Sequence, residues 1–157
     1  MKHSNEIVEL YTIKCIELID AISNVLFPPN DITNSKGEKS IIKVSDAKID
    51  RYILMRAAWQ PDSFGYPVLE SLKDILNISQ SYYQKNFTEL LNDEQNYFIE
   101  KLEKGEFNIS PSYTRKRQKE IFRIIHQSIS EGLFSDPGYG GNDKEVGWFY
   151  SNFKTKG

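Results

Sequence analysis

The chain has 157 residues with a formal net charge of −2, 27% charged residues and 39% apolar residues. This length and composition are typical of one soluble globular domain, and the slightly acidic balance argues against a nucleic-acid-binding protein. The sequence contains no run of about 18 apolar residues, which argues against a membrane-spanning helix, and its one cysteine, Cys15, rules out an intrachain disulfide.

Apolar residues at intervals of three and four predict a first helix over residues 5–27. Cys15 lies among isoleucines on this helix, so we expect a buried and inert thiol. Two prolines at 28 and 29 end the helix, because the residue before a proline is driven out of the α conformation. The polar stretch 28–40 then predicts a surface loop.

Two further helices are predicted in the middle of the chain. Ser45 or Asp46 is the candidate N-cap of the second helix, which the stretch QPDSFGYP interrupts. Pro67 suits the first turn of the third helix, and apolar residues at helical spacing continue from there to Leu90.

The last two helices have clearer boundary signals. Asn92 can cap the fourth helix, and Gln95 lies three residues later, which is the spacing of a capping box. Gly105 is a suitable stop for that helix. The fifth helix is predicted to begin after Pro111 and to run to about Leu133.

These elements predict an all-α fold, with about five helices in a compact bundle and no sheet. We expect one domain over residues 1–157. Its helical body covers about residues 5–134, and a docking loop and irregular tail, rich in glycine and aromatic residues, cover residues 135–157.

The sequence offers few groups for catalysis or metal binding. His3 and His126 stand in unrelated places, and no cluster of histidine, cysteine or carboxylate residues has metal-ligand spacing. His126 falls on the fifth helix, where a structural or surface role is expected. The basic run 115–119 is expected to be a hydrated helix face. No catalytic, cofactor-binding or metal-binding residue is therefore assigned.

The stretch SDPGYGGNDKEVGW differs in composition from the rest of the chain. A phosphate-binding loop does not fit it, because Asp143 occupies the place of the third glycine in the dinucleotide fingerprint and no Lys-Ser or Lys-Thr follows. Asp136 can accept backbone hydrogen bonds, Pro137 restricts one dihedral, and the paired glycines permit positive φ. These features predict a preformed turn.

The aromatic residues in and after this turn must be covered by other atoms. They either pack on the chain's own helices or anchor a second protein, because Tyr and Trp are frequent interface hot spots. The candidate partner-binding residues are Asp136, Pro137, Tyr139, Gly140, Gly141, Asn142, Gly147, Trp148 and Phe149.

The same residues resemble a known family. GLFSDPGYGGNDKEVGW is similar to the C-terminal signature of the gluconate 2-dehydrogenase subunit 3 family, in which Asp-Pro-x-Tyr-Gly-Gly-Asn is followed by Gly-Trp. Three upstream segments resemble the family in the same order: LFPPND, VSDAKIDRYI and LNDEQNYFIEKLEKGEF.

The resemblance implies a non-catalytic accessory (small) subunit. Such a subunit binds and stabilises the large subunit of an FAD-dependent sugar or alcohol oxidoreductase of the glucose-methanol-choline type. It implies that FAD is carried by the partner, that this chain holds no cofactor, and that a cytochrome or another acceptor receives the electrons. Neither nucleic acid nor a direct membrane span is expected.

Two features depart from the family pattern. Many members begin with a twin-arginine export signal, which this sequence lacks, and WFYSNFKTKG replaces the usual Ile-Gly-Phe-Pro-like ending. We expect a cytoplasmic protein as written, or a periplasmic one if the partner carries the signal or a leader was trimmed. Two other functions stay open: a free-standing small sugar-modifying enzyme that uses His126 and carboxylates, and a self-associating helical scaffold without a redox partner.

Overall fold

The computed structural model describes residues 12–33, 36–109 and 111–151. The predicted start of the first helix, His3 and the last six residues of the predicted tail lie outside this part. Within it the fold is all-α, as predicted, with six helices of which five are long. They are α2 (Ile13–Leu26), α3 (Ile49–Trp59), α4 (Tyr66–Tyr83), α5 (Asn92–Lys104), α6 (Arg115–Phe134) and the short α7 (Val146–Tyr150).

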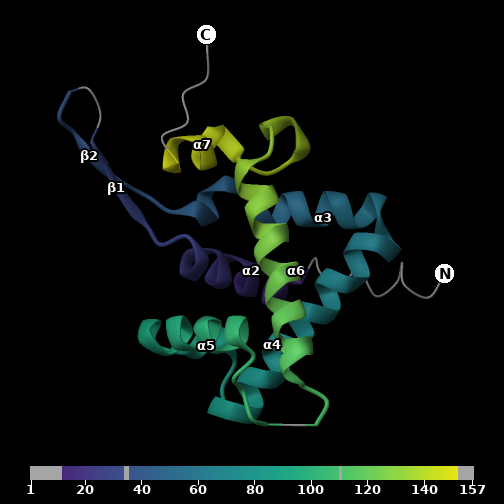
Figure 1. Cartoon of the computed structure of the whole chain (residues 1–157). Helices are drawn as coiled ribbons and strands as arrows, with labels where there is room; N and C mark the ends of the chain where they lie inside the picture. The colour runs from purple at the N-terminus through teal and green to yellow at the C-terminus, as the bar shows by residue number, and fades with distance from the viewer. Residues whose placement is uncertain (1–11, 34–35, 110, 152–157) are drawn as a thin grey trace.

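The long helix α6 connects the two ends of the molecule. It contacts α3, α4 and α5 along its length, and α7 at its C-terminal end. In Figure 1, α3 and α7 lie near the upper end of α6, and α4 and α5 lie near its lower end. The C-terminal loop therefore lies beside α3, although about 90 positions separate the contacting residues in the sequence.

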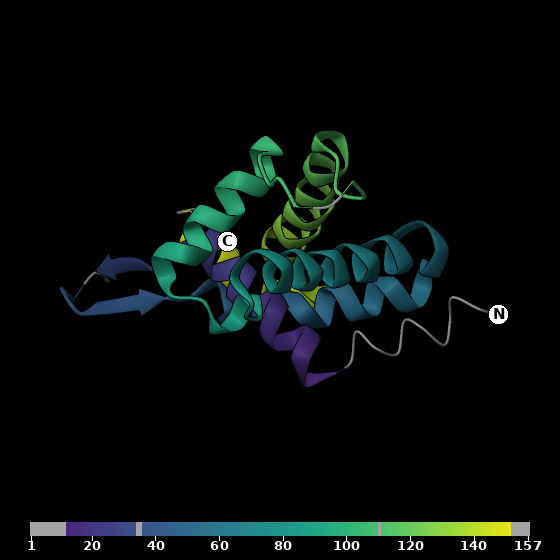
Figure 2. The ribbon, with the colours of Figure 1, turned by 90° about the horizontal axis from the view of Figure 1, so that it is seen from below.

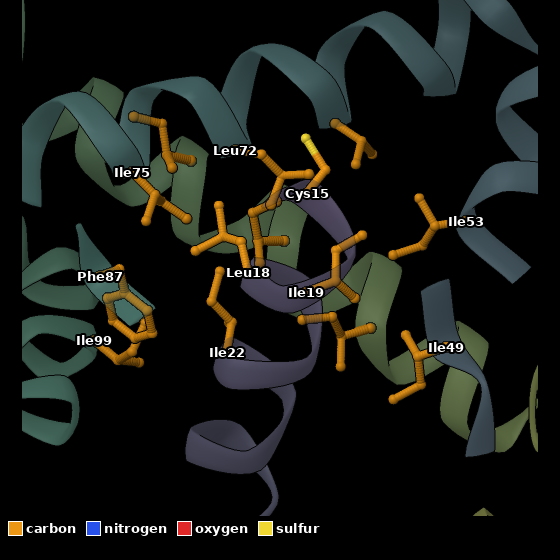
Figure 3. Close-up of a cluster of buried hydrophobic side chains, with 14 of the residues drawn as sticks. Cys15, Leu18, Ile19, Ile22, Ile49, Ile53, Leu72, Ile75, Phe87 and Ile99 are labelled. Carbon is orange, nitrogen blue, oxygen red and sulfur yellow. The ribbon is translucent and has the colours of Figure 1, made fainter. Parts of the chain in front are cut away.

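The core is centred on α2 (Figure 3). Its apolar stripe is almost completely buried against the neighbouring helices, as the spacing of three and four predicts. Cys15 is buried in this cluster with a free thiol, so its predicted burial is confirmed. The buried side chains labelled in Figure 3 are Cys15, Leu18, Ile19, Ile22, Ile49, Ile53, Leu72, Ile75, Phe87 and Ile99.

The prediction of a plain loop after the first helix, and of no strand anywhere, is wrong at one place. Strands β1 (Asn30–Thr33) and β2 (Lys39–Ile42) form an antiparallel hairpin, in which Asn30 pairs with Ile42 and Thr33 with Lys39. The hairpin extends away from the helical body (Figures 1 and 2). The strand sequences NDIT and KSII do not alternate between apolar and polar residues, so the pattern that predicts a strand is absent from them.

The predicted cap of the second helix is also wrong. A 3-10 turn, Val44–Ala47, occupies the place where Ser45 or Asp46 was expected to cap, and α3 begins only at Ile49. Lys48 between them has a left-handed conformation, with φ of +58°. Burial of the two apolar residues at the ends of the 3-10 turn holds this segment against the core, so the helix starts later than its capping signal suggests.

The observed boundaries of α4 and α5 match the sequence-based prediction at two residues and differ from it at two others. Pro67 lies in the first turn of α4, and Gly105 ends α5 with φ of +68°, as predicted. The predicted third helix ends before Leu90, at Tyr83. The N-cap of α5 is Leu91 and not Asn92, and Glu94, rather than Gln95, accepts the Leu91 N–H at 3.0 Å.

Candidate partner-binding site

The stretch after α6 turns back onto the helices in two 3-10 turns, Pro137–Tyr139 and Asp143–Glu145, before α7 begins. We call residues 135–148 the signature loop. The Asp136 carboxylate accepts a hydrogen bond from the Gly138 N–H at 2.9 Å, so this aspartate caps the first turn. The loop is therefore an ordered turn, as its proline and glycines predict.

Asn142 fastens the signature loop to the end of α6. Its side chain is completely buried and its φ is +47°, a conformation that asparagine tolerates better than most residues. Its backbone N–H donates to the Gly132 carbonyl at 2.8 Å, and its side-chain amide donates to the Ser135 carbonyl at 2.8 Å. Its Oδ1 accepts the Gly147 N–H at 2.6 Å. One side chain thus satisfies backbone groups at a helix end, where carbonyls lack partners within the helix.

Two glycines allow this close contact. A Cβ on Gly141 would collide with the Gly132 carbonyl oxygen, and a Cβ on Gly147 would collide with the Leu133 carbonyl oxygen. The backbone of the loop therefore lies directly on the backbone of the last turn of α6, and no other residue fits at either position. These glycines shape the loop by their lack of a side chain.

Arg51 of α3 holds the loop from the other side. Its Nε donates to the Gly140 carbonyl at 2.7 Å, and its Nη2 pairs with the Asp143 carboxylate at 2.8 Å. Sequence analysis missed this residue, because a contact across 89 positions has no local signal. The only available hint is that Arg51 belongs to the segment VSDAKIDRYI, which resembles the family.

The aromatic tail is partly covered by the chain itself. The Trp148 indole N–H donates to the Phe134 carbonyl at 3.2 Å, and the Tyr150 hydroxyl donates to the Pro28 carbonyl at 2.8 Å. The ring of Phe27 meets those of Phe134 and Tyr150 edge-on, with centroids 5.7 and 6.2 Å apart. The chain itself therefore covers Trp148 and Tyr150 in part, which is the first of the two possibilities that the sequence left open.

Tyr139 differs from these residues because its side chain is 62% exposed. It borders a groove of about 320 Å³ between α3 and the signature loop, which Trp59 and Met55 of α3 also line. Trp59 is 78% exposed and Met55 39% exposed. The groove residues are Tyr52, Met55, Arg56, Trp59, Gln60, Ser135, Gly138 and Tyr139. Sequence analysis did not single out Trp59 or Met55.

The predicted partner-binding residues thus fall into different environments. Asp136 is exposed and Pro137 half-buried, whereas Gly140, Gly141, Asn142 and Gly147 are buried in the chain itself. Trp148 is half-buried, and the side chain of Phe149 lies outside the described part. Partner binding by these residues stays a prediction. Tyr139 is the large side chain among them that is exposed enough to make the contact.

A second, more polar cleft of about 330 Å³ lies beyond Arg56, between α3, α4 and α6. Its charged residues neutralise one another, because Arg56 pairs with Glu131 and Arg123 pairs with Glu120. The guanidinium of Arg56 also lies 4.2 Å above the centroid of the Phe64 ring. These contacts account for the charged side chains in the cleft without a ligand.

His126 does not join the carboxylates of this cleft. It is exposed on α6 and stacks against the rings of Phe122 and Phe27, with centroids 5.4 and 6.1 Å away. Among the described residues, no group of three or more histidine, cysteine or carboxylate side chains is placed to hold a metal ion. The geometry of the described part supports a binding surface better than a catalytic site.

Comparisons with known proteins identify one relationship. The family model described as Gluconate 2-dehydrogenase subunit 3 matches residues 14–154, which is nearly the whole chain. No curated protein and no solved structure gives a match. None of the described helices has the length and apolar character needed to cross a membrane.

Proposed function

The chain belongs to the gluconate 2-dehydrogenase subunit 3 family, and from that premise we propose that it is a non-catalytic accessory subunit of a dehydrogenase complex. Its role is to bind and stabilise a large FAD-dependent sugar or alcohol oxidoreductase subunit of the glucose-methanol-choline type. In this proposal the flavin and the acid–base residues belong to the partner, and a cytochrome or another acceptor receives the electrons. The subunit shares the compartment of its partner.

The observation that carries the proposal is the groove between α3 and the signature loop. Trp59 and Tyr139 stand on its rim with more than half of their side-chain area exposed. Large aromatic side chains are the most frequent binding hot spots, and full burial of one contributes on the order of 4 kcal/mol. Met55 adds a flexible apolar contact, which adapts well to a partner's surface.

The buried part of the signature loop makes this surface rigid. Asn142 and Arg51 hold the loop backbone by hydrogen bonds, and Tyr139 lies between the residues that they fasten. A surface that is already ordered loses less conformational entropy on binding, so more of the contact energy appears as affinity. The family signature then has two tasks: its glycines and asparagine shape the loop, and its tyrosine contacts the partner.

The test is co-expression with a large flavoprotein subunit of the proposed class, sought first in the neighbouring reading frame, followed by measurement of the dissociation constant between the two subunits. We expect Trp59→Ala and Tyr139→Ala each to weaken binding by about 2–4 kcal/mol, or roughly 30- to 1,000-fold. Because both side chains are exposed, the melting temperature of the free subunit should change little. Tyr97→Ala is the matched control, since Tyr97 is 49% exposed on α5, away from the groove.

Three results would contradict parts of this proposal. Normal binding by the Trp59→Ala, Tyr139→Ala double variant would place the partner elsewhere on the subunit. Failure of the wild-type chain to bind the flavoprotein would remove the accessory role. A concentration-dependent dimer that Trp59→Ala dissociates, in the absence of flavoprotein binding, would instead support the self-associating scaffold.

A further inference from the structure

The hairpin of β1 and β2 takes no part in the site described above, and the rest of the chain supports it little. Its two strands form the only sheet of the described part, and each strand contacts the other far more than it contacts any helix. Figures 1 and 2 show the hairpin extending away from the helical body. An isolated two-stranded hairpin is marginally stable at best in water, and a third strand or a covering helix is what stabilises it.

The outer edge of β2 offers backbone hydrogen bonds to another chain. In an antiparallel pair, successive residues of a strand direct their N–H and C=O groups alternately toward the paired strand and away from it. β1 lies on one side of β2, and no described strand lies on the other. Alternate backbone groups of β2 therefore face outward, and an open edge of this kind pairs readily with a further strand.

The exposed side chains of β2 indicate which strand would fit. Residues 39, 41 and 43 alternate along an extended backbone, so their side chains point to the same side. Lys39 and Lys43 are exposed, and the side chain of Ile41 between them is 63% exposed. A strand paired with β2 is stabilised most by an apolar residue opposite Ile41 and by acidic residues opposite the two lysines.

A second copy of this chain does not fit the same edge. If two β2 strands paired antiparallel with Ile41 opposite Ile41, Lys39 of each copy would lie opposite Lys43 of the other. Like charges directly opposite one another destabilise a sheet. The charges therefore favour a different chain, with acidic residues at these positions.

The base of the hairpin lies at the end of the subunit that carries the candidate partner-binding site. The Tyr150 hydroxyl of α7 donates to the Pro28 carbonyl, just before β1, at 2.8 Å. Val44, just after β2, is completely buried, and the 3-10 turn that it begins contacts α7. Because α7 directly follows the signature loop, the hairpin and the loop are both tied to this helix.

We propose that the hairpin is a second docking element, to which the large subunit adds an edge strand alongside β2. The added strand carries an apolar side chain opposite Ile41 and acidic side chains opposite Lys39 and Lys43. It supplies the third strand that stabilises the hairpin, and its backbone pairs with the open edge. This inference rests on the proposed function, because it gives the same large subunit a second point of contact.

The first test removes the hairpin and leaves its base in place. The Cα atoms of Asn30 and Ile42 already pair, so an Asn-Gly turn can replace residues 31–41 and join them. We expect the dissociation constant for the co-expressed large subunit to rise at least about tenfold. The melting temperature of the free subunit should change by less than about 2 °C, because the hairpin packs little on the body. Unchanged affinity would overturn the inference.

Charge reversal tests the sign of the added strand. Lys39→Glu combined with Lys43→Glu should weaken binding by about tenfold or more, because acidic residues would then face acidic residues. Lys116→Glu combined with Lys119→Glu is the matched control, since both lysines are exposed at the start of α6, at the other end of the molecule. The control should stay within about twofold of the wild type. Equal or tighter binding by the hairpin variant would contradict an acidic partner strand.

Amide hydrogen exchange in the wild-type complex separates strand addition from contact by side chains alone. In the free subunit, the amides of β2 that face β1 should exchange slowly and the alternate amides rapidly. In the complex the alternate amides should also exchange at least about tenfold more slowly. Unchanged exchange of these amides would refute strand addition, whatever the affinity of the hairpin variants.

The outcomes distinguish this inference from the proposed function. A wild-type subunit that does not bind the large subunit overturns both. Wild-type binding that Trp59→Ala weakens and the hairpin replacement leaves unchanged overturns the second docking element alone.

Discussion

Two irregular connections of this subunit are each fastened by one buried carboxamide, but they leave different surfaces. The connection between α5 and α6 is held by Gln118, and the signature loop is held by Asn142. Gln118 accepts the Phe107 N–H at 2.9 Å and donates to the carbonyls of Phe107 and Tyr113, both at 2.8 Å. In both cases the side chain supplies the hydrogen bonds that a strand or helix would otherwise provide.

The two connections differ in what they expose. Among its described residues, the first connection has no exposed large apolar side chain, and Tyr113 bonds to the buried carboxylate of Asp74 at 3.1 Å. The signature loop exposes Tyr139 beside Trp59. A buried amide clamp is therefore a feature of the fold. The exposed aromatic residues Tyr139 and Trp59 distinguish the signature loop from the first connection, and they make its surface suited to a partner.

The largest effect is expected where the loop backbone touches α6. Gly147→Ala places a Cβ against the Leu133 carbonyl, so the loop must move away from the helix. We expect this substitution to lower the free energy of unfolding by at least about 3 kcal/mol. Chemical denaturation measures the loss. Gly138→Ala is the matched control in the same loop, because its Cβ would meet only the end of the Asp136 side chain, and it should cost less than about 1 kcal/mol. Equal losses in the two variants would contradict the close contact.

The two clamps themselves can be compared directly. Asn142→Ala removes two side-chain hydrogen bonds to backbone groups and Gln118→Ala removes three, so each substitution should lower the free energy of unfolding by about 2–4 kcal/mol. Only Asn142→Ala should also weaken binding to the proposed large subunit at a temperature where both variants remain folded. If Gln118→Ala weakens binding to the same degree, the distinction between the two connections is wrong.

A smaller effect is expected at Arg51. Its side chain is half exposed, so Arg51→Met should lower the free energy of unfolding by only about 1 kcal/mol through the lost bonds to Gly140 and Asp143. The amide hydrogens of the loop should nevertheless exchange faster, because the α3 side of the loop is released. Arg123→Met removes an arginine that pairs with Glu120 and Gln127 of its own helix α6, and it should leave exchange in the loop unchanged. Unchanged exchange in Arg51→Met would show that Asn142 alone holds the loop.

Local patterns in the sequence were sufficient for much of the fold. The stripe of α2 is buried as its spacing predicts, Pro67 starts α4 and Gly105 ends α5. The turn at Asp136 and Pro137 also forms as the local sequence predicts. Each of these features depends on residues within about one helical turn of one another, so a short stretch of sequence contains all of the relevant physics.

Other features depended on contacts between distant residues. The four-residue strands form only by pairing with each other, and Lys48 turns left-handed where burial of its neighbours overrides the capping signal at Ser45 and Asp46. In the candidate site, the sequence determined that the signature loop would turn and carry aromatics. Only the tertiary structure decided that Asn142 faces inward, that Tyr139 faces outward and that Trp59 lies beside it. The physical reason is that the period of a helix is set by residues close together in the chain. The burial of a side chain is set by the segment that packs against it, and here that segment lies about 80 or 90 residues away.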